Sequence, residues 1–134
     1  MANPSTHTGS CLCGAVTYAV AVELEPIVIC HCTMCRRQTG HFLATTNAAA
    51  ADLALSGAEH VRWYQSSEQA ERGFCGTCGS VLFWRRRNGS DRVAIAMGGF
   101  DLPTGATIGR HIFVAEKGDY YEVEADAPQF EGDD

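Results

Sequence analysis

The chain has 134 residues, enough for one ordinary domain; 46% are hydrophobic and 19% charged, which excludes intrinsic disorder. No apolar run is long enough to span a bilayer, so a membrane protein is not expected. The net charge of −6 argues against a nucleic-acid-binding protein, because binding to a phosphate backbone requires a basic surface.

Short strands separated by turn residues dominate the pattern. Alternating apolar residues predict a strand over 15–22, with Val16, Tyr18 and Val20 on one face. Glycine, asparagine or aspartate often separates the other candidates, as antiparallel turns require. In chain order these candidates are residues 42–47, 61–64, 81–84, 93–97 and 112–115.

Helices are few and short in this reading. Residues 32–38 are predicted to form one short helix that ends at Gly40, and residues 48–55 form either a second short helix or a single turn. We therefore expect a mainly β fold with one or two short helices. One domain is expected over 1–134, with a core at about 9–131 and flexible ends at 1–8 and 132–134.

The first nine residues are polar and uncharged and do not resemble a signal peptide. The expected location is therefore the cytoplasm, where structural disulfides are rare. This matters because the chain has seven cysteines, an odd number that cannot form a complete disulfide framework.

The seven cysteines fall into three closely spaced groups, which indicates metal binding rather than scattered core thiols. The groups are Cys11 and Cys13; Cys30, Cys32 and Cys35; and Cys75 and Cys78. A structural zinc takes four protein ligands, and a catalytic zinc commonly takes three and keeps one position for water or substrate. Seven cysteines therefore match two Zn²⁺ ions, one of each kind.

The spacing favours one division of the ligands. Cys30, Cys32 and Cys35 can surround one catalytic ion within six residues. The structural ion then takes Cys11, Cys13, Cys75 and Cys78. A rival division, with Cys11, Cys13, Cys30 and Cys32 on one ion, would split the compact triplet. The turn at residues 75–79 supports the structural assignment, because glycine there can adopt positive φ and aim N–H groups at the sulfurs.

His31 lies between two of these cysteines. In an extended segment it would face away from the metal, so a hydrogen-bonding role beside the ligands is preferred to ligation. His31, His41 and His111 are chemically suited to move a proton, and His31 is our candidate catalytic histidine. Arg36 and Arg37 form either a solvated face or a surface that attracts an anionic substrate.

These motifs resemble the glutathione-dependent formaldehyde-activating enzymes, a family that includes the centromere protein V-like domains. The resemblance covers residues 9–131 and rests on the segments 9–16, 30–40, 71–80, 111–117 and 128–131. It implies an Mss4-like β-tent of packed antiparallel sheets stapled by zinc. It also implies structural zinc on Cys11, Cys13, Cys75 and Cys78, and catalytic zinc on Cys30, Cys32 and Cys35.

The resemblance implies a carbon–sulfur lyase that joins glutathione to formaldehyde, giving S-hydroxymethylglutathione, and reverses the reaction. The partners would be a small thiol and an aldehyde. Family members often carry tryptophan where this chain has Asp119-Tyr120-Tyr121. Two other classes stay open at this point: a non-catalytic, zinc-stapled protein-binding module, and a sensor of zinc or of thiol oxidation.

Overall fold

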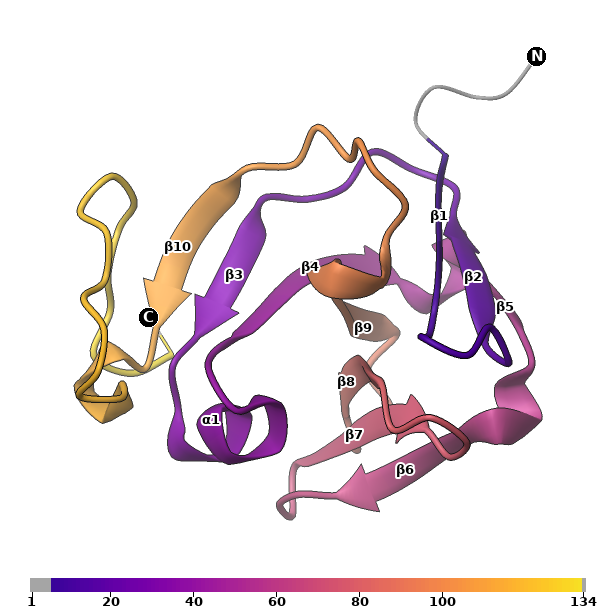
Figure 1. Cartoon of the computed structure of the whole chain (residues 1–134), viewed down its shortest axis with the longest axis horizontal. Coiled ribbons are helices and arrows are strands. Elements are labelled where there is room, and N and C mark those ends of the chain that lie inside the picture. The colour runs from indigo at the N-terminus through magenta and orange to yellow at the C-terminus, as the bar shows by residue number, and fades with distance from the viewer. Residues whose placement is uncertain (1–5, 134) are drawn as a thin grey trace.

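The computed structural model describes residues 6–133 and shows 10 strands in two sheets with one α-helix, which confirms the mainly β prediction (Figure 1). The smaller sheet has the order β1 (His7–Ser10), β2 (Thr17–Val20), β5 (Leu53–Ser56). The larger sheet has the order β10 (Ile108–Ile112), β3 (Ile27–Cys30), β4 (Leu43–Ala49), β9 (Arg92–Ala96), β8 (Val81–Arg86), β7 (Ala70–Cys75), β6 (Val61–Gln65). All pairs are antiparallel except β10 with β3, which are parallel.

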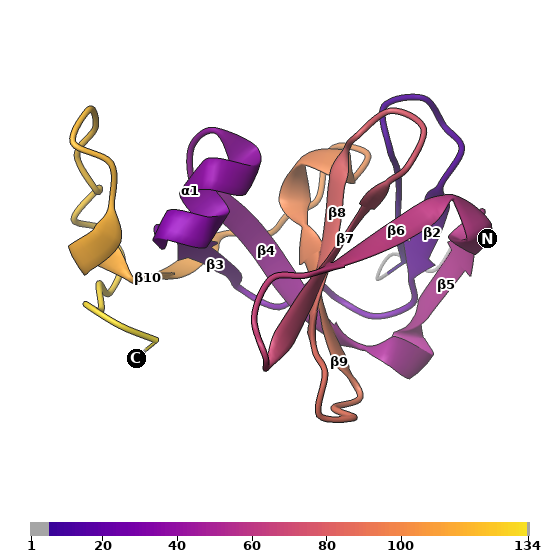
Figure 2. The same cartoon turned by 90° about the horizontal axis from the view of Figure 1, so that it is seen from below.

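Helix α1 (Thr33–Thr39) forms where the sequence predicts it. Cys32 is its N-cap, and its sulfur accepts a hydrogen bond from the backbone N–H of Cys35. Gly40 ends the helix with a φ of 84°, a left-handed conformation that glycine adopts without strain. The helix lies beside β3 and β4 in both views (Figures 1 and 2). None of the helices over residues 6–133 has the length and hydropathy needed to cross a membrane.

Two segments differ from the sequence prediction. Residues 48–55 contain one 3₁₀ turn at Ala50–Asp52, as the single-turn alternative predicts, but the residues on either side of it belong to β4 and β5, which neither alternative predicts. The strand predicted over 112–115 instead ends at Ile112. Phe113 adopts a left-handed φ of 55°, which breaks the extended chain before a 3₁₀ turn at Val114–Glu116.

Four strands, β1, β3, β5 and β7, were not among the predicted elements, because they are short or lack clear apolar alternation. β1 includes His7 and Thr8, which were expected in a flexible end. The rest of that predicted end, residues 1–5, lies outside the described residues, as does Asp134 at the other end.

Tyr18 joins the two sheets in the main core. Its ring packs edge-on against Phe83 of β8 and against Phe100, with centroid separations of 5.8 and 5.4 Å. Its phenol comes so close to Gly9 and Gly99 that a side chain at either position would collide with it. Burial, reinforced by the charge of Asp101, raises the pKa of Tyr18 to about 12, so the phenol stays neutral. Glycine therefore permits the aromatic packing that holds the smaller sheet on the larger one.

Gly57 tests a second close approach, between the residue after β5 and the backbone before β2. Its φ is +78°, and a Cβ atom there would lie 1.9 Å from the carbonyl oxygen of Ala15. We expect Gly57→Ala to lower the free energy of unfolding by about 3 kcal/mol or more, from backbone strain plus this collision. Gly89→Ala, at φ +84° with open space around it, should cost only about 1–2 kcal/mol. Urea denaturation measures both, and equal losses would contradict the account.

Candidate functional site

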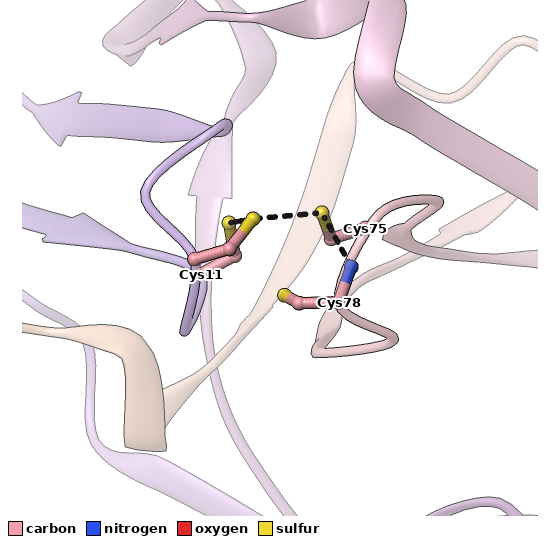
Figure 3. Close-up of side chains that lie close together, drawn as sticks. Cys11, Cys75 and Cys78 are labelled. Atoms are coloured by element: carbon pink, nitrogen blue, oxygen red, sulfur yellow. Dashed lines mark hydrogen bonds between the residues drawn. The ribbon is translucent and has the colours of Figure 1, made fainter.

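Four cysteines from two distant loops come together between the sheets. The four sulfurs all lie within 4.8 Å of one another. We name this group the four-cysteine cluster: Cys11, Cys13, Cys75 and Cys78. The first pair follows β1 and the second pair spans the turn at the end of β7. Figure 3 shows Cys11 opposite Cys75 and Cys78. Gly14 and Gly79 both have a φ of 82° and make the two tight turns possible, as predicted for the turn at 75–79.

Backbone N–H groups point at the sulfurs of this cluster. Val16 donates to Cys11 at 3.3 Å, and Thr77 and Cys78 donate to Cys75 at 3.4 and 3.5 Å. Such hydrogen bonds favour the thiolate form, which is the form that ligates metals. The nearby Ser80 hydroxyl acts in the same direction, since its hydrogen bond helps to lower the pKa of Cys78 to about 5.

The sulfur spacing fits a tetrahedral zinc ion. Sγ of Cys13 lies 3.7 Å from Sγ of Cys11 and 3.8 Å from Sγ of Cys75. A Zn–S distance of ~2.3 Å gives an S···S edge of ~3.8 Å in a tetrahedron. The cluster could therefore hold a metal ion, and four thiolates at this spacing match structural Zn²⁺.

A second group, which we name the cysteine triad, consists of Cys30, Cys32 and Cys35. Its three sulfurs also lie within 4.8 Å of one another, and no His, Asp or Glu of residues 6–133 joins them. Cys30 ends β3, Cys32 caps α1 and Cys35 lies in its first turn, so the strand-to-helix junction assembles the group. Hydrogen bonds from the other two thiols strongly lower the pKa of Cys32, with further help from the Cys35 N–H and the charge of Arg72. The triad could therefore also hold a metal ion, with three protein ligands.

The triad lies on the wall of a cavity of about 600 Å³. Apolar side chains such as Val28, Leu43 and Ile112 form part of its lining. The charged residues of the lining are Arg72, Arg86, Arg92, Arg110, Glu116 and Asp133. The four-cysteine cluster is absent from this lining, so only one of the two candidate metal sites faces the cavity.

Arg72 of β7 is a site residue that the sequence analysis missed. The side chain is buried, and its two terminal nitrogens lie 3.5 and 3.6 Å from the sulfur of Cys35. Nη1 also donates to the Gln38 side-chain oxygen at 2.9 Å. Arg72 lies three residues before Cys75 in the sequence, but nothing in the sequence shows that its side chain reaches α1.

His31 points away from the triad. Its Nδ1 lies 2.7 Å from the Tyr121 hydroxyl and its Nε2 lies 3.0 Å from Nδ1 of His111. Burial, together with the charges of His111, His41 and Lys117, lowers the pKa of His31 to about 4, so the ring is neutral at neutral pH. The ring is fully enclosed and does not line the cavity.

The other predicted proton carriers and cations also lie off the cavity wall. His41 pairs with the Tyr120 hydroxyl at 3.0 Å, and His111 is bound to His31. Neither histidine is part of the cavity lining, and the same holds for Arg36, Arg37, Tyr120 and Tyr121. Tyr120 and Tyr121 therefore contact histidines rather than the cavity.

Glu116 is the acidic residue of the lining with a direct contact to the triad segment. Its Oε1 accepts a hydrogen bond of 3.0 Å from the backbone N–H of Thr33, which directly follows Cys32. The sequence analysis did not select it, since a lone glutamate 84 positions after Cys32 carries no spacing signal. The break at Phe113 ends β10 and lets the chain return toward α1.

This chain is similar to known proteins in both sequence and structure. A family model described as glutathione-dependent formaldehyde-activating enzyme matches residues 6–116, which include every cysteine, Arg72 and Glu116. An uncharacterized lyase of Schizosaccharomyces pombe is 30% identical over 117 residues, covering 87% of this chain and 84% of the yeast protein. The crystal structure of a Rhodobacter sphaeroides protein is similar with a TM-score of 0.57 and 28% identity, covering 73% of this chain and 91% of that one.

The two cysteine groups should respond differently to substitution. Cys35→Ser should reduce the bound zinc from two ions per chain to about one and lower the unfolding midpoint only modestly. Cys78→Ser breaks the link between two distant loops and should cost at least ~3 kcal/mol of unfolding free energy. Metal analysis and thermal unfolding measure the two effects. Equal destabilisation by both substitutions would contradict this division of roles.

Proposed function

The chain belongs to the glutathione-dependent formaldehyde-activating enzyme family, and on this premise we propose that it is a zinc-dependent carbon–sulfur lyase. The proposed reaction joins glutathione to formaldehyde, giving S-hydroxymethylglutathione, and also runs in reverse. Two Zn²⁺ ions per chain would serve it, one structural and one catalytic. The seven free thiols suit a reducing compartment such as the cytoplasm.

One observation carries the proposal: a set of three cysteine sulfurs, rather than four, lies on the cavity wall. Three protein ligands with a remaining position for substrate are typical of catalytic zinc, whereas the four-cysteine cluster has the ligand number of a structural site. A volume of about 600 Å³ also lies within the range of small-molecule sites. A protein-binding module would need neither the incomplete ligand set nor the cavity beside it.

The charge of the cavity supports an anionic thiol as substrate. Four arginines and two acidic residues line it, although the whole chain carries a net charge of −6. Arg92 is paired with Glu25, whereas no ion pair among the described residues engages Arg72, Arg86 or Arg110. Glutathione carries two carboxylates, so Arg86 and Arg110 would attract and orient it, whereas the terminal nitrogens of Arg72 already contact Cys35 and Gln38.

The site's chemistry follows from its residues. A zinc ion held by Cys30, Cys32 and Cys35 would stabilise a substrate thiol as its thiolate. During synthesis the sulfur–hydrogen bond breaks, the sulfur–carbon bond forms, and the carbonyl oxygen gains a proton. During cleavage the hydroxyl oxygen loses its proton as the sulfur–carbon bond breaks. The chain must therefore hold the thiol against formaldehyde and move one proton.

Glu116 is our candidate for moving that proton. Its carboxylate lines the cavity and is held at the first residue of α1 by the Thr33 N–H. The enclosed His31 would act indirectly, because its bonds to Tyr121 and His111 fix the backbone between Cys30 and Cys32. The apolar part of the wall would limit the access of water to the reacting atoms.

The direct test is exchange between free glutathione and S-hydroxymethylglutathione in the presence of formaldehyde, followed by NMR. Zinc-loaded wild-type protein should accelerate the exchange, and Cys35→Ser should remove the acceleration. No acceleration by protein that contains two zinc ions would contradict the proposed reaction. A binding module or a sensor would then be the better account.

Glu116→Gln tests the proposed proton carrier. Loss of a general acid or base typically lowers the rate about 10²- to 10⁴-fold, so kcat should fall by at least ~10²-fold with little change in KM. Glu131→Gln, which removes an exposed carboxylate outside the cavity lining, is the matched control. A kcat within twofold of wild type for Glu116→Gln would exclude this role.

A further inference from the structure

The environment of Arg72 is unusual for a buried cation. The residue is 4% exposed, yet none of the ion pairs formed within residues 6–133 includes it. Buried arginine is costly unless a charged or hydrogen-bonded partner compensates it. Its Nε has no hydrogen-bond partner, and its two other nitrogens are directed at α1. The compensating partner must therefore be sought in the helix.

That partner is the sulfur of Cys35. Nη1 and Nη2 lie 3.5 and 3.6 Å from it, so both arms of the guanidinium approach one atom. The Gln38 side-chain oxygen accepts a hydrogen bond from Nη1 at 2.9 Å and fixes the orientation of the guanidinium group. Cys35 and Gln38 lie on one face of α1, three residues apart. A planar cation with several donors suits a thiolate far better than a neutral thiol.

The charges explain why a cation is needed at this place. Three thiolates around one divalent ion leave a net negative charge, and a fourth thiolate from a substrate would double it. The positive charge of Arg72 would offset the single negative charge that the three thiolates and the ion carry before the substrate binds. At the four-cysteine cluster, backbone N–H groups and Ser80 supply the hydrogen bonds to sulfur. The triad has one such N–H bond, to Cys32, and adds the guanidinium of Arg72.

We propose that Arg72 is a positioning residue that holds Cys35 toward the metal and offsets the negative charge of the triad. In this way it allows the site to accept a fourth, anionic sulfur ligand. The proposal rests on the proposed function, since it assumes that the triad binds the metal and the substrate thiol. It assigns the residue a role in metal and thiol affinity rather than only in packing.

The experiment compares metal and thiol binding in variants of the full chain. Arg72→Gln removes the positive charge. Arg72→Lys keeps the charge but lacks the two terminal nitrogens that approach Cys35. Gln38→Met keeps the guanidinium but removes its hydrogen bond to the Gln38 side chain. Arg37→Gln removes an exposed charge from the same helix without touching a sulfur and serves as the control. Competition with a chromophoric chelator gives the zinc affinities. The thiolate-to-metal absorption of the cobalt-loaded protein reports glutathione binding.

In Arg72→Gln we expect one zinc ion to bind about 10- to 100-fold more weakly and the other to keep its affinity. Glutathione should bind the cobalt-loaded variant at least tenfold more weakly, and Arg72→Lys should recover part of both losses. Arg37→Gln should match wild type. Zinc and glutathione affinities within twofold of wild type in Arg72→Gln would overturn the proposal.

A folding defect in Arg72→Gln would be recognised by circular dichroism and by loss of both ions. Gln38→Met then decides: weaker binding of one ion supports the proposal, and unchanged binding of both overturns it. These affinities do not depend on turnover. An inactive wild-type protein with two bound ions would therefore contradict the proposed lyase activity, while the affinities would still decide the role of Arg72.

Discussion

The closeness of several cysteine sulfurs is the constraint on which the structure depends. Thiolates repel one another, so four of them stay within 4.8 Å only when hydrogen bonds and a cation compensate their charge. In the four-cysteine cluster this requirement ties the loop after β1 to the turn after β7. The packing of Tyr18 against Phe83 and Phe100 also holds the two sheets together. β7 also carries Arg72, three residues before Cys75, so the element anchored at one cluster supplies the cation of the other.

The two groups solve the same electrostatic problem in different ways. The four-cysteine cluster lies in two turns, where backbone N–H groups reach the sulfurs and the ligand number is complete. The triad lies at a strand-to-helix junction beside a cavity, where a buried guanidinium approaches one sulfur. This contrast matches a closed structural site and an open catalytic one. Under the proposed function, one small domain would in this way combine a rigid structural site with a second site that admits substrate.

The sequence predicts the parts of this arrangement that are local. The spacing of the cysteines, the helix after Cys32 and its end at Gly40 all depend on neighbouring residues, and the structure shows the grouping and the helix. Arg72 and Glu116 could not be predicted in this way, because they reach the triad from β7 and from a turn after β10. His31 lies between Cys30 and Cys32 in the sequence, yet its ring contacts Tyr121, far along the chain. These contacts depend on which strands lie next to each other in the sheet. The periodic pattern of a single sequence does not specify that order.

The central claim is that one cysteine group is closed and the other is open to a thiol. Cadmium-113 NMR of the cadmium-substituted protein tests it most directly, since the chemical shift reports the number of sulfur ligands on each ion. We predict two resonances, one unaffected by glutathione and one that moves toward a four-sulfur shift as glutathione is added. The account would be contradicted if neither resonance moves when glutathione is added. It would also be contradicted if both resonances have a four-sulfur chemical shift before glutathione is added.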